Sequence, residues 1–314
     1  MKNIIFTILA LIIILAISCQ KENIKNDNNS ANAIKITAQT VTDNSLRTAF
    51  INPSVNWIAG VDHIGLYSNR AYTDEPGNYA SNVDYTAVST GTISTFTSTT
   101  PVYWDGTNNE HDFGAYYPYV AGTFPFTAVP ICLPSSQTQD GATTDHIGPL
   151  DFEVATPIGI FPGTGEGGTN PTVGFNFNHV FTILKFDITC SNAHTLTQIS
   201  VTKDVAPNIS LNTGSTIDIS TYPTPALYTI TEASGGTPLN VTLTLSPTLP
   251  ISSTIASAYM LILPGNHTGT GNFTIDFKNE NNTTYTLHKD GINFERGKVY
   301  TVTVDIPVGA GGWE

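Results

Sequence analysis

The residues whose types could do chemistry gather in one acidic loop, residues 105–112, which reads Asp-Gly-Thr-Asn-Asn-Glu-His-Asp. Its carboxylate and amide oxygens are ligands that Ca²⁺ prefers, although the spacing differs from that of an EF-hand. Glu110 and Asp112 could instead act as paired acids in sugar hydrolysis, or bind a carbohydrate with the flanking Tyr103, Trp104 and Tyr116. We favour the plainer alternatives, because Asp-Gly and Asn-Asn are also common turn formers and aromatic side chains usually pack in a core.

The short sequence signatures of common enzyme classes are absent. The chain contains no G-x-S-x-G, H-E-x-x-H, P-loop or C-x-x-C motif. Its seven histidines never fall at a close metal-ligand spacing; they are His63, His111, His146, His179, His194, His267 and His288. We therefore expect a protein that is not an enzyme and has no catalytic residues, metal or cofactor.

The start of the chain predicts export and lipidation. Residues 4–17 are apolar apart from Thr7, which suits the h-region of a signal peptide, about 7–15 residues, better than a membrane helix of about 20. The following Leu-Ala-Ile-Ser-Cys, residues 15–19, resembles the lipobox of bacterial lipoproteins. That resemblance implies removal of residues 1–18 and acylation of Cys19, for example with palmitate, so that the chain is anchored to the outer membrane at the cell surface. The alternative is an ordinary secreted protein with a free Cys19.

Charge excludes one class of partner. The formal net charge is −13, and no Lys or Arg lies between Arg70 and Lys185, where many carboxylates do. Nucleic-acid binding needs clustered basic residues, so we expect none. The acidic stretch could attract cations or basic partners, but a solubilised surface is the simpler interpretation.

Two cysteines remain after Cys19. Cys132 and Cys190 each have apolar neighbours, which favours two unpaired thiols in the core. An exported protein also permits a disulfide between them.

The pattern of the remaining chain predicts an all-β protein. Alternating apolar and polar residues at 33–38, 241–245, 273–277 and 299–306 indicate strands with one buried face. The length favours two domains, and the composition favours antiparallel β-sandwiches. We place a polar tether at 19–32 and the domains at 33–170 and 171–314, divided by a glycine-rich segment with two prolines, residues 161–171.

Several segments together resemble the fimbrillin-like lipoproteins of Bacteroidetes. The resemblance begins with Leu-Arg-Thr-Ala-Phe at 46–50 and a Trp-Ile-Ala-Gly-Val-Asp-His-Ile-Gly stretch from Trp57, which departs from the family pattern by the extra Val61 and by Leu46 in place of Thr. Four further segments follow in the family's order: residues 115–119, 177–186, 260–265 and 296–302. The resemblance implies two transthyretin-like, Greek-key sandwiches in a pilus subunit or adhesin.

The resemblance also implies an assembly mechanism. In such subunits an arginine-specific protease removes an N-terminal strand, and a strand from another pilus subunit fills the groove. Here Arg47 follows the strand region 34–41, so cleavage between Arg47 and Thr48 would release that strand; alternatively, Arg47 is only an exposed or ion-paired side chain. Residues 307–314 are a poor donor strand, which favours a tip or anchor subunit, or a non-polymerising adhesin, over a stalk subunit, although residues 299–306 could themselves be the donor. Host or bacterial surface ligands are further possible partners, and a glycan-binding outer-membrane lipoprotein is the alternative function.

Overall fold

A computed structural model describes residues 33–40, 56–75, 77–107, 109–155, 158–160, 171–220, 229–234, 239–269, 272–307, 309 and 313. These residues are almost entirely in strands and their connections, apart from the four-residue helix α3 (Ile147–Leu150). The all-β prediction is therefore confirmed. Among the helices of the described residues, none is long and apolar enough to cross a membrane.

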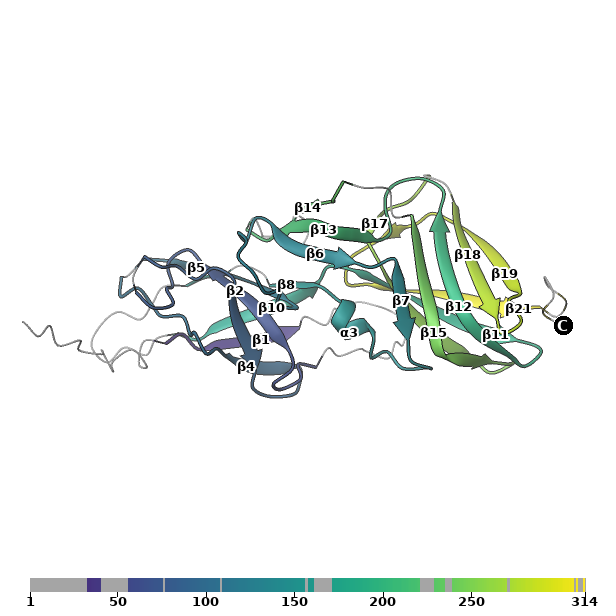
Figure 1. Cartoon of the computed structure of the whole chain (residues 1–314), viewed down its shortest axis with the longest axis horizontal. Helices are drawn as coiled ribbons and strands as arrows, with labels where there is room; N and C mark the ends of the chain where they lie inside the picture. Colours follow the sequence, from purple (N-terminus) through teal and green to yellow (C-terminus); the bar gives the residue numbers. More distant parts are fainter. Residues whose placement is uncertain are drawn as a thin grey trace, which may run out of the picture. The chain divides into compact units, whose positions relative to one another are not determined.

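The first sheet closes on itself. Its order is β2-β3-β4-β1-β10-β8-β5-β9, and an additional pairing of β2 with β5 completes a ring (Figure 1). The strands are β1 (Ile36–Thr40), β2 (His63–Ser68), β3 (Val83–Ala87), β4 (Ile93–Thr97), β5 (His111–Tyr117), β8 (Glu153–Ala155), β9 (Ile158–Ile160) and β10 (Val173–His179). A closed ring leaves few free strand edges, so the order of these strands determines where another chain could pair.

The inside of the ring is an aromatic core around Trp57. This side chain is fully buried and meets Phe96, Tyr117 and Phe177 edge-on, with ring centroids 5.1, 5.5 and 5.3 Å away. Edge-to-face pairs at such distances add to the free energy of burial. The alternation of β1 points Ile36 and Ala38 into the same core.

Two other sheets contribute side chains to a second core. One has the order β16-β11-β21 and the other β19-β18-β12-β15-β7. Their strands are β7 (Ser136–Gln139), β11 (Thr182–Cys190), β12 (His194–Lys203), β15 (Asn240–Ile251), β16 (Ala256–Ile262), β18 (Asn272–Asn279), β19 (Thr284–Asp290) and β21 (Val299–Ile306). Apolar residues of both sheets, such as Phe186 and Phe277, form one buried cluster. The strands expected from alternation at 241–245, 273–277 and 299–306 are confirmed as parts of β15, β18 and β21.

A third core joins segments from both halves of the chain. The small sheet β14-β13-β6 is built from β6 (Val129–Leu133), β13 (Leu211–Asp218) and β14 (Thr229–Thr231), and β17 (Gly265–Asn266) pairs with β20 (Asn293–Phe294). The apolar residues of β6 and β13 pack with Tyr67 and Tyr116 of the ring. Strand pairing therefore crosses residue 170: β10 joins the ring, while β6 and β7 pair with β13 and β15. The domain division near residue 170 therefore stays a prediction, because strands from both sides of this residue belong to the same sheets.

The two cysteines of the described residues are both free. Cys190 is buried in the second core, as expected. Cys132 is exposed, so its predicted place in a core is wrong. The alternation of β6 explains the difference, because Ile131 and Leu133 take the buried positions on either side of it.

Candidate functional site

The site residues predicted at the start of the chain, Cys19, Arg47 and Thr48, lie outside the described residues. The described part of the strand region predicted to precede Arg47, residues 34–40, contains β1. The pairing and burial of β1 show which contacts its removal would break.

Strand β1 lies between two other strands of the ring. It pairs parallel with β10, from Ile36 opposite Val173 to Thr40 opposite Phe177. On its other side it pairs antiparallel with β4, from Ile36 opposite Phe96 to Gln39 opposite Ile93. β4 and β10 have no direct pairing in the described sheet, so β1 is the element that joins them.

The inward side chains of this segment fill sites in the aromatic core. Ile34, Ile36 and Ala38 are 5%, 1% and 2% exposed, whereas the alternate residues Lys35 and Gln39 are exposed and Thr37 is partly buried. Burying an isoleucine side chain contributes about 1.5–3 kcal/mol relative to leaving it in water. Loss of the segment would thus open apolar sites at every second position, between two rows of unpaired backbone groups.

One other sheet edge is covered by side chains instead of a strand. On the free side of β16, the buried Gln137 amide donates to the Leu261 carbonyl over 2.7 Å and accepts from the Leu261 N–H over 3.0 Å. Gln139 does the same with the Ser257 carbonyl at 3.3 Å and the Tyr259 N–H at 2.7 Å. Both glutamines belong to β7, so this edge is already satisfied and is a poor place for strand addition.

Strands β19 and β21 lie at the other ends of the two sheets that contain β7 and β16. Among the described strands, each pairs on one side only. Strand β19 is mostly exposed and carries His288, Lys289 and Asp290, and charges of this kind discourage edge pairing. Strand β21 presents Thr301, Thr303 and Asp305 to solvent.

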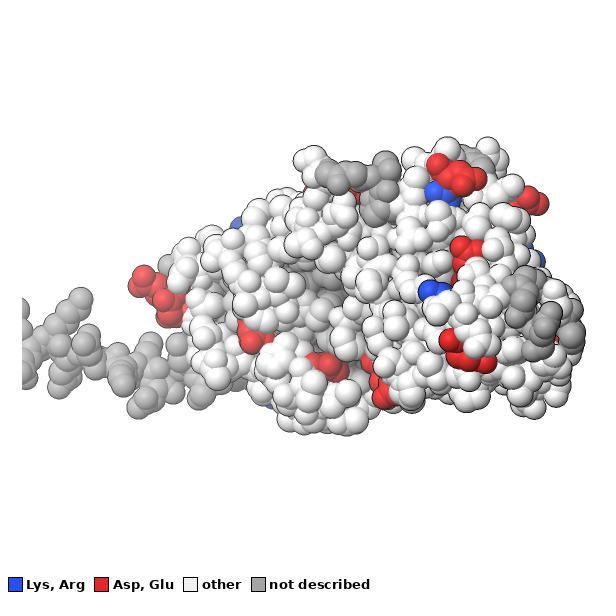
Figure 2. Space-filling view, turned by 45° about the vertical axis from the view of Figure 1, so that its right-hand side comes forward, with Lys and Arg blue, Asp and Glu red and all other residues white. Residues whose placement is uncertain are grey.

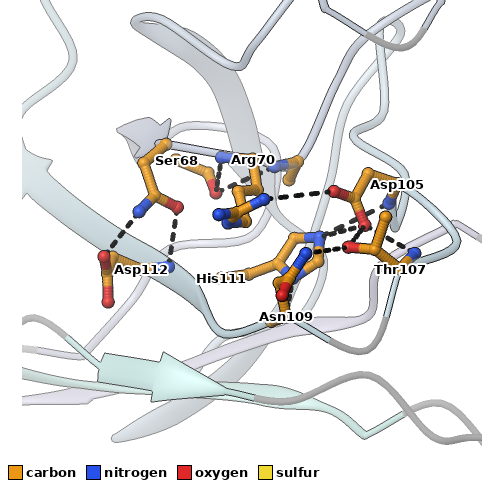
Figure 3. Close-up of polar contacts among 9 residues, drawn as sticks. Ser68, Arg70, Asp105, Thr107, Asn109, His111 and Asp112 are labelled. Atoms are coloured by element: carbon orange, nitrogen blue, oxygen red, sulfur yellow. Dashed lines mark hydrogen bonds and ion pairs between the residues drawn. The ribbon is translucent and has the colours of Figure 1, made fainter.

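The acidic loop is organised by its own hydrogen bonds (Figure 3). Asp105 Oδ1 accepts from the backbone N–H of Thr107 at 2.8 Å and from its hydroxyl at 2.6 Å. Arg70 Nη1 lies 3.9 Å from Asp105 Oδ2. Partial burial alone would raise the pKa of Asp105, but the hydrogen bonds from Thr107, the nearby imidazole of His111 and the charge of Arg70 together hold it below its ordinary value. The turn interpretation thus accounts for Asp105 without a cation.

His111 is a buried structural residue at the base of this loop. Its Nδ1 lies 2.9 Å from the Asn109 carbonyl, which can only accept, so Nδ1 carries the proton. Nε2 lies 3.4 Å from the Asp105 backbone nitrogen and 3.2 Å from Asp105 Oδ1, so the imidazole links both ends of the loop. Trp104 packs edge-on against the imidazole at 5.0 Å, and both side chains belong to the ring's interior.

Glu110 and Asp112 line a pocket of about 640 Å³ together with Tyr67, Tyr79 and Phe126. Glu110 folds over Gly159, where any side chain would collide with its carboxylate. Asp112 is held by Asn69, whose amide donates to Oδ2 over 2.5 Å. The sequence pointed to this acidic pair but not to these aromatic partners, because they come from segments far apart in the chain.

The aromatic residues that the sequence placed beside the acids lie elsewhere. Trp104 and Tyr116 are 3% and 0% exposed and belong to cores, which confirms the packing interpretation for both. Tyr103 stacks against Tyr72 with ring centroids 5.8 Å apart. None of these three lines the pocket beside Glu110 and Asp112.

Acidic residues are distributed rather than concentrated on the visible surface. On the face drawn in Figure 2, Asp and Glu form separate small patches on a mostly uncharged surface. This distribution favours solubilisation over the attraction of one large basic partner.

Comparison with known proteins identifies relatives of most of the chain. The sequence model described as "Fimbrillin-like" matches residues 47–311. A solved structure of a candidate cell adhesion protein from Bacteroides uniformis matches with a TM-score of 0.54 and 20% identity, covering 87% of this chain and 92% of that one. One from Bacteroides ovatus matches with a TM-score of 0.55 and 20% identity, covering 89% and 94%. At this identity the two structures indicate a shared fold. No curated protein matches the chain.

The Asp105 network predicts a loss of stability in acid. Because its pKa is lowered on folding, its contribution is present above the unfolded pKa of about 3.9 and disappears as pH falls through the folded pKa. We expect Asp105→Asn to lower the free energy of unfolding by about 1–2 kcal/mol at pH 7, and by less below pH 4. Urea denaturation at several pH values measures this. The exposed Glu75→Gln should change little, and an Asp105→Asn effect that is independent of pH would contradict the charge-based explanation.

Proposed function

We propose that this chain, which belongs to the fimbrillin-like family, is a cell-surface subunit or adhesin that joins other pilus subunits by β-strand addition. The observation that carries the proposal is the position of β1. This strand is the link between β4 and β10, and Arg47 follows its last residue, Thr40, by a short segment.

The physical basis is the cost of unpaired backbone groups. A buried N–H or C=O without a partner costs about 1–3 kcal/mol, so a ring that has lost β1 strongly favours a replacement strand. The replacement must present small or apolar residues at alternate positions, to occupy the sites of Ile34, Ile36 and Ala38. Both requirements suit a strand supplied by another subunit.

Several finer features belong to the same proposal. Cys19 is lipidated after removal of residues 1–18, so that the protein is delivered to the outer membrane as a lipoprotein. The chain forms two transthyretin-like sandwich domains that meet near residue 170.

Processing at Arg47 is the most direct test of this function. We expect mass spectrometry of protein from the producing cells to find a mature form that begins at Thr48. Arg47→Ala should leave a form that begins at acylated Cys19, and high-molecular-weight assemblies should disappear from gels of unheated samples. The change removes the cleavage site without touching a described contact.

Arg70→Ala is the matched control, because it removes another arginine of the mature chain and should leave processing unchanged. A wild-type protein that stays monomeric and keeps its acylated Cys19 would contradict strand exchange. Processing with no assembly would leave the adhesin part of the proposal and remove the polymer part.

The pocket at Glu110 and Asp112 favours a second candidate function, the capture of a glycan at the outer membrane. Carboxylates beside Tyr67, Tyr79 and Phe126 combine hydrogen-bond acceptors with apolar ring faces, as sugar sites do. The Tyr79 side chain is half exposed and can be removed without opening a core.

Glycan arrays with the purified protein and Tyr79→Ala test this second function. Saturable binding of an oligosaccharide that Tyr79→Ala abolishes, and that Tyr285→Ala in β19 leaves intact, is the expected result. Absence of binding by the wild-type protein, or equal binding by both variants, would exclude the pocket as a glycan site.

A further inference from the structure

Three side chains that commonly bind metal ions lie close together near Thr40, the last residue of β1. Asp151 follows helix α3, and the register of β8 and β10 places Glu153 opposite His179. His179 Nδ1 lies 2.5 Å from Asp151 Oδ2 and 3.8 Å from Glu153 Oε1. One ligand atom from each residue lies within 4.8 Å of the other two. These three residues are called the 151–153–179 cluster below.

Glu153 in this cluster is buried and makes no hydrogen bond of ordinary geometry, although the Thr40 hydroxyl lies near its carboxylate. The residue is 0% exposed, and neither of its carboxylate oxygens accepts a hydrogen bond. A buried carboxylate normally has several donors, so an unsatisfied one requires a specific explanation. Such an explanation is a proton on the carboxylate or a cation bound to it.

The surroundings of Glu153 are rich in further oxygen atoms. The hydroxyl of Thr40, on β1, is also buried without a hydrogen-bond partner and is close enough to lower the pKa of Glu153. The carboxylate of Asp62 acts on Glu153 in the opposite direction. Three carboxylates, those of Asp62, Asp151 and Glu153, therefore lie in this region with the imidazole of His179.

The carboxylates of the cluster favour a proton on His179, and a metal ion has to displace this proton to bind the imidazole nitrogen. Burial raises the pKa of Glu153, although His179 opposes this effect. Burial alone would lower the pKa of His179, but the charges of Asp151 and Glu153 outweigh it and raise that pKa.

We propose that Asp151, Glu153 and His179 bind a divalent transition-metal cation, with Zn²⁺ as the representative ion. One imidazole nitrogen and two carboxylate oxygens are a ligand set for Zn²⁺ or Mn²⁺, whereas Ca²⁺ requires six to eight oxygens. Zn²⁺ ligands lie about 2.0–2.2 Å from the ion, so adjacent ligand atoms are about 3.3 Å apart, a value between the two distances observed from His179. The side chain of His179 is 21% exposed, which gives the cation a path from solvent.

A cation here would connect three parts of the ring. It would tie the segment after α3 to β8 and β10, and the Thr40 hydroxyl places the end of β1 beside it. The sequence did not indicate the site, because His179 is far from Asp151 and Glu153 in the chain. The Asp-x-Glu spacing at 151–153 was the available signal, since it puts both carboxylates on one face of an extended segment.

Zinc titration of the purified protein, first stripped with a chelator, tests the proposal. Isothermal titration calorimetry should give one site per chain, and Zn²⁺ should raise the melting temperature. Glu153→Gln and Asp151→Asn should each weaken Zn²⁺ binding at least tenfold and abolish the rise in melting temperature. Co²⁺ in place of Zn²⁺ should give visible absorption bands that the same variants lose, because its spectrum reports on the bound ligands.

Glu280→Gln is the matched control. Glu280 also faces a histidine, with its Oε1 3.2 Å from His194 Nδ1, but Glu280 is exposed. The Glu280→Gln variant should therefore bind Zn²⁺ with the affinity of the wild-type protein. Circular dichroism checks that each variant is folded; Glu153→Gln should be, because it replaces an unsatisfied charge by a neutral amide. No saturable binding of Zn²⁺, binding of Ca²⁺ only, or equal affinity in wild type and both cluster variants would overturn the proposal.

Discussion

The pairing of β1 with both β4 and β10 is the interaction on which the rest of this structure depends. A strand at the centre of a sheet satisfies two rows of backbone groups at once, and here it also fills apolar sites beside Trp57. Because β1 lies near the start of the described chain, it is the link that can leave without breaking any later connection. Two other sheet edges are less suited to strand addition, because glutamines of β7 cover the edge of β16 and charged residues line the edge of β19.

Much of the fold followed from sequence because alternation is a local signal. The strands at 241–245, 273–277 and 299–306 were predictable from residues that are neighbours in the chain. The crossing of residue 170 was not, because whether β10 pairs with β1 or with a later strand depends on long-range packing that a local pattern does not contain. The same limit applied to Cys132, since alternation predicts two faces but does not say which one is buried.

The residues with chemical potential divide into two groups. Those in the acidic loop are largely engaged in structure: Asp105 with Thr107, Asp112 with Asn69, and His111 with Asn109. Asp105 and His111 have partners within the loop, whereas Asp112 is held by Asn69 from a distant segment, so the loop carries little unsatisfied charge. The 151–153–179 cluster is the opposite case. It brings His179 of β10 to Asp151, which follows α3, and to Glu153 of β8, and the buried Glu153 makes no hydrogen bond of ordinary geometry.

Hydrogen–deuterium exchange of the protein before and after cleavage at Arg47 tests the role of β1 most directly. Departure of the strand should leave the amides of β4 and β10 fast to exchange, while those of β12 and β18 in the other core stay protected. Addition of a peptide with the sequence of residues 33–41 should restore protection in β4 and β10 only. Unchanged protection after the strand has left, or a peptide that restores nothing, would contradict the account.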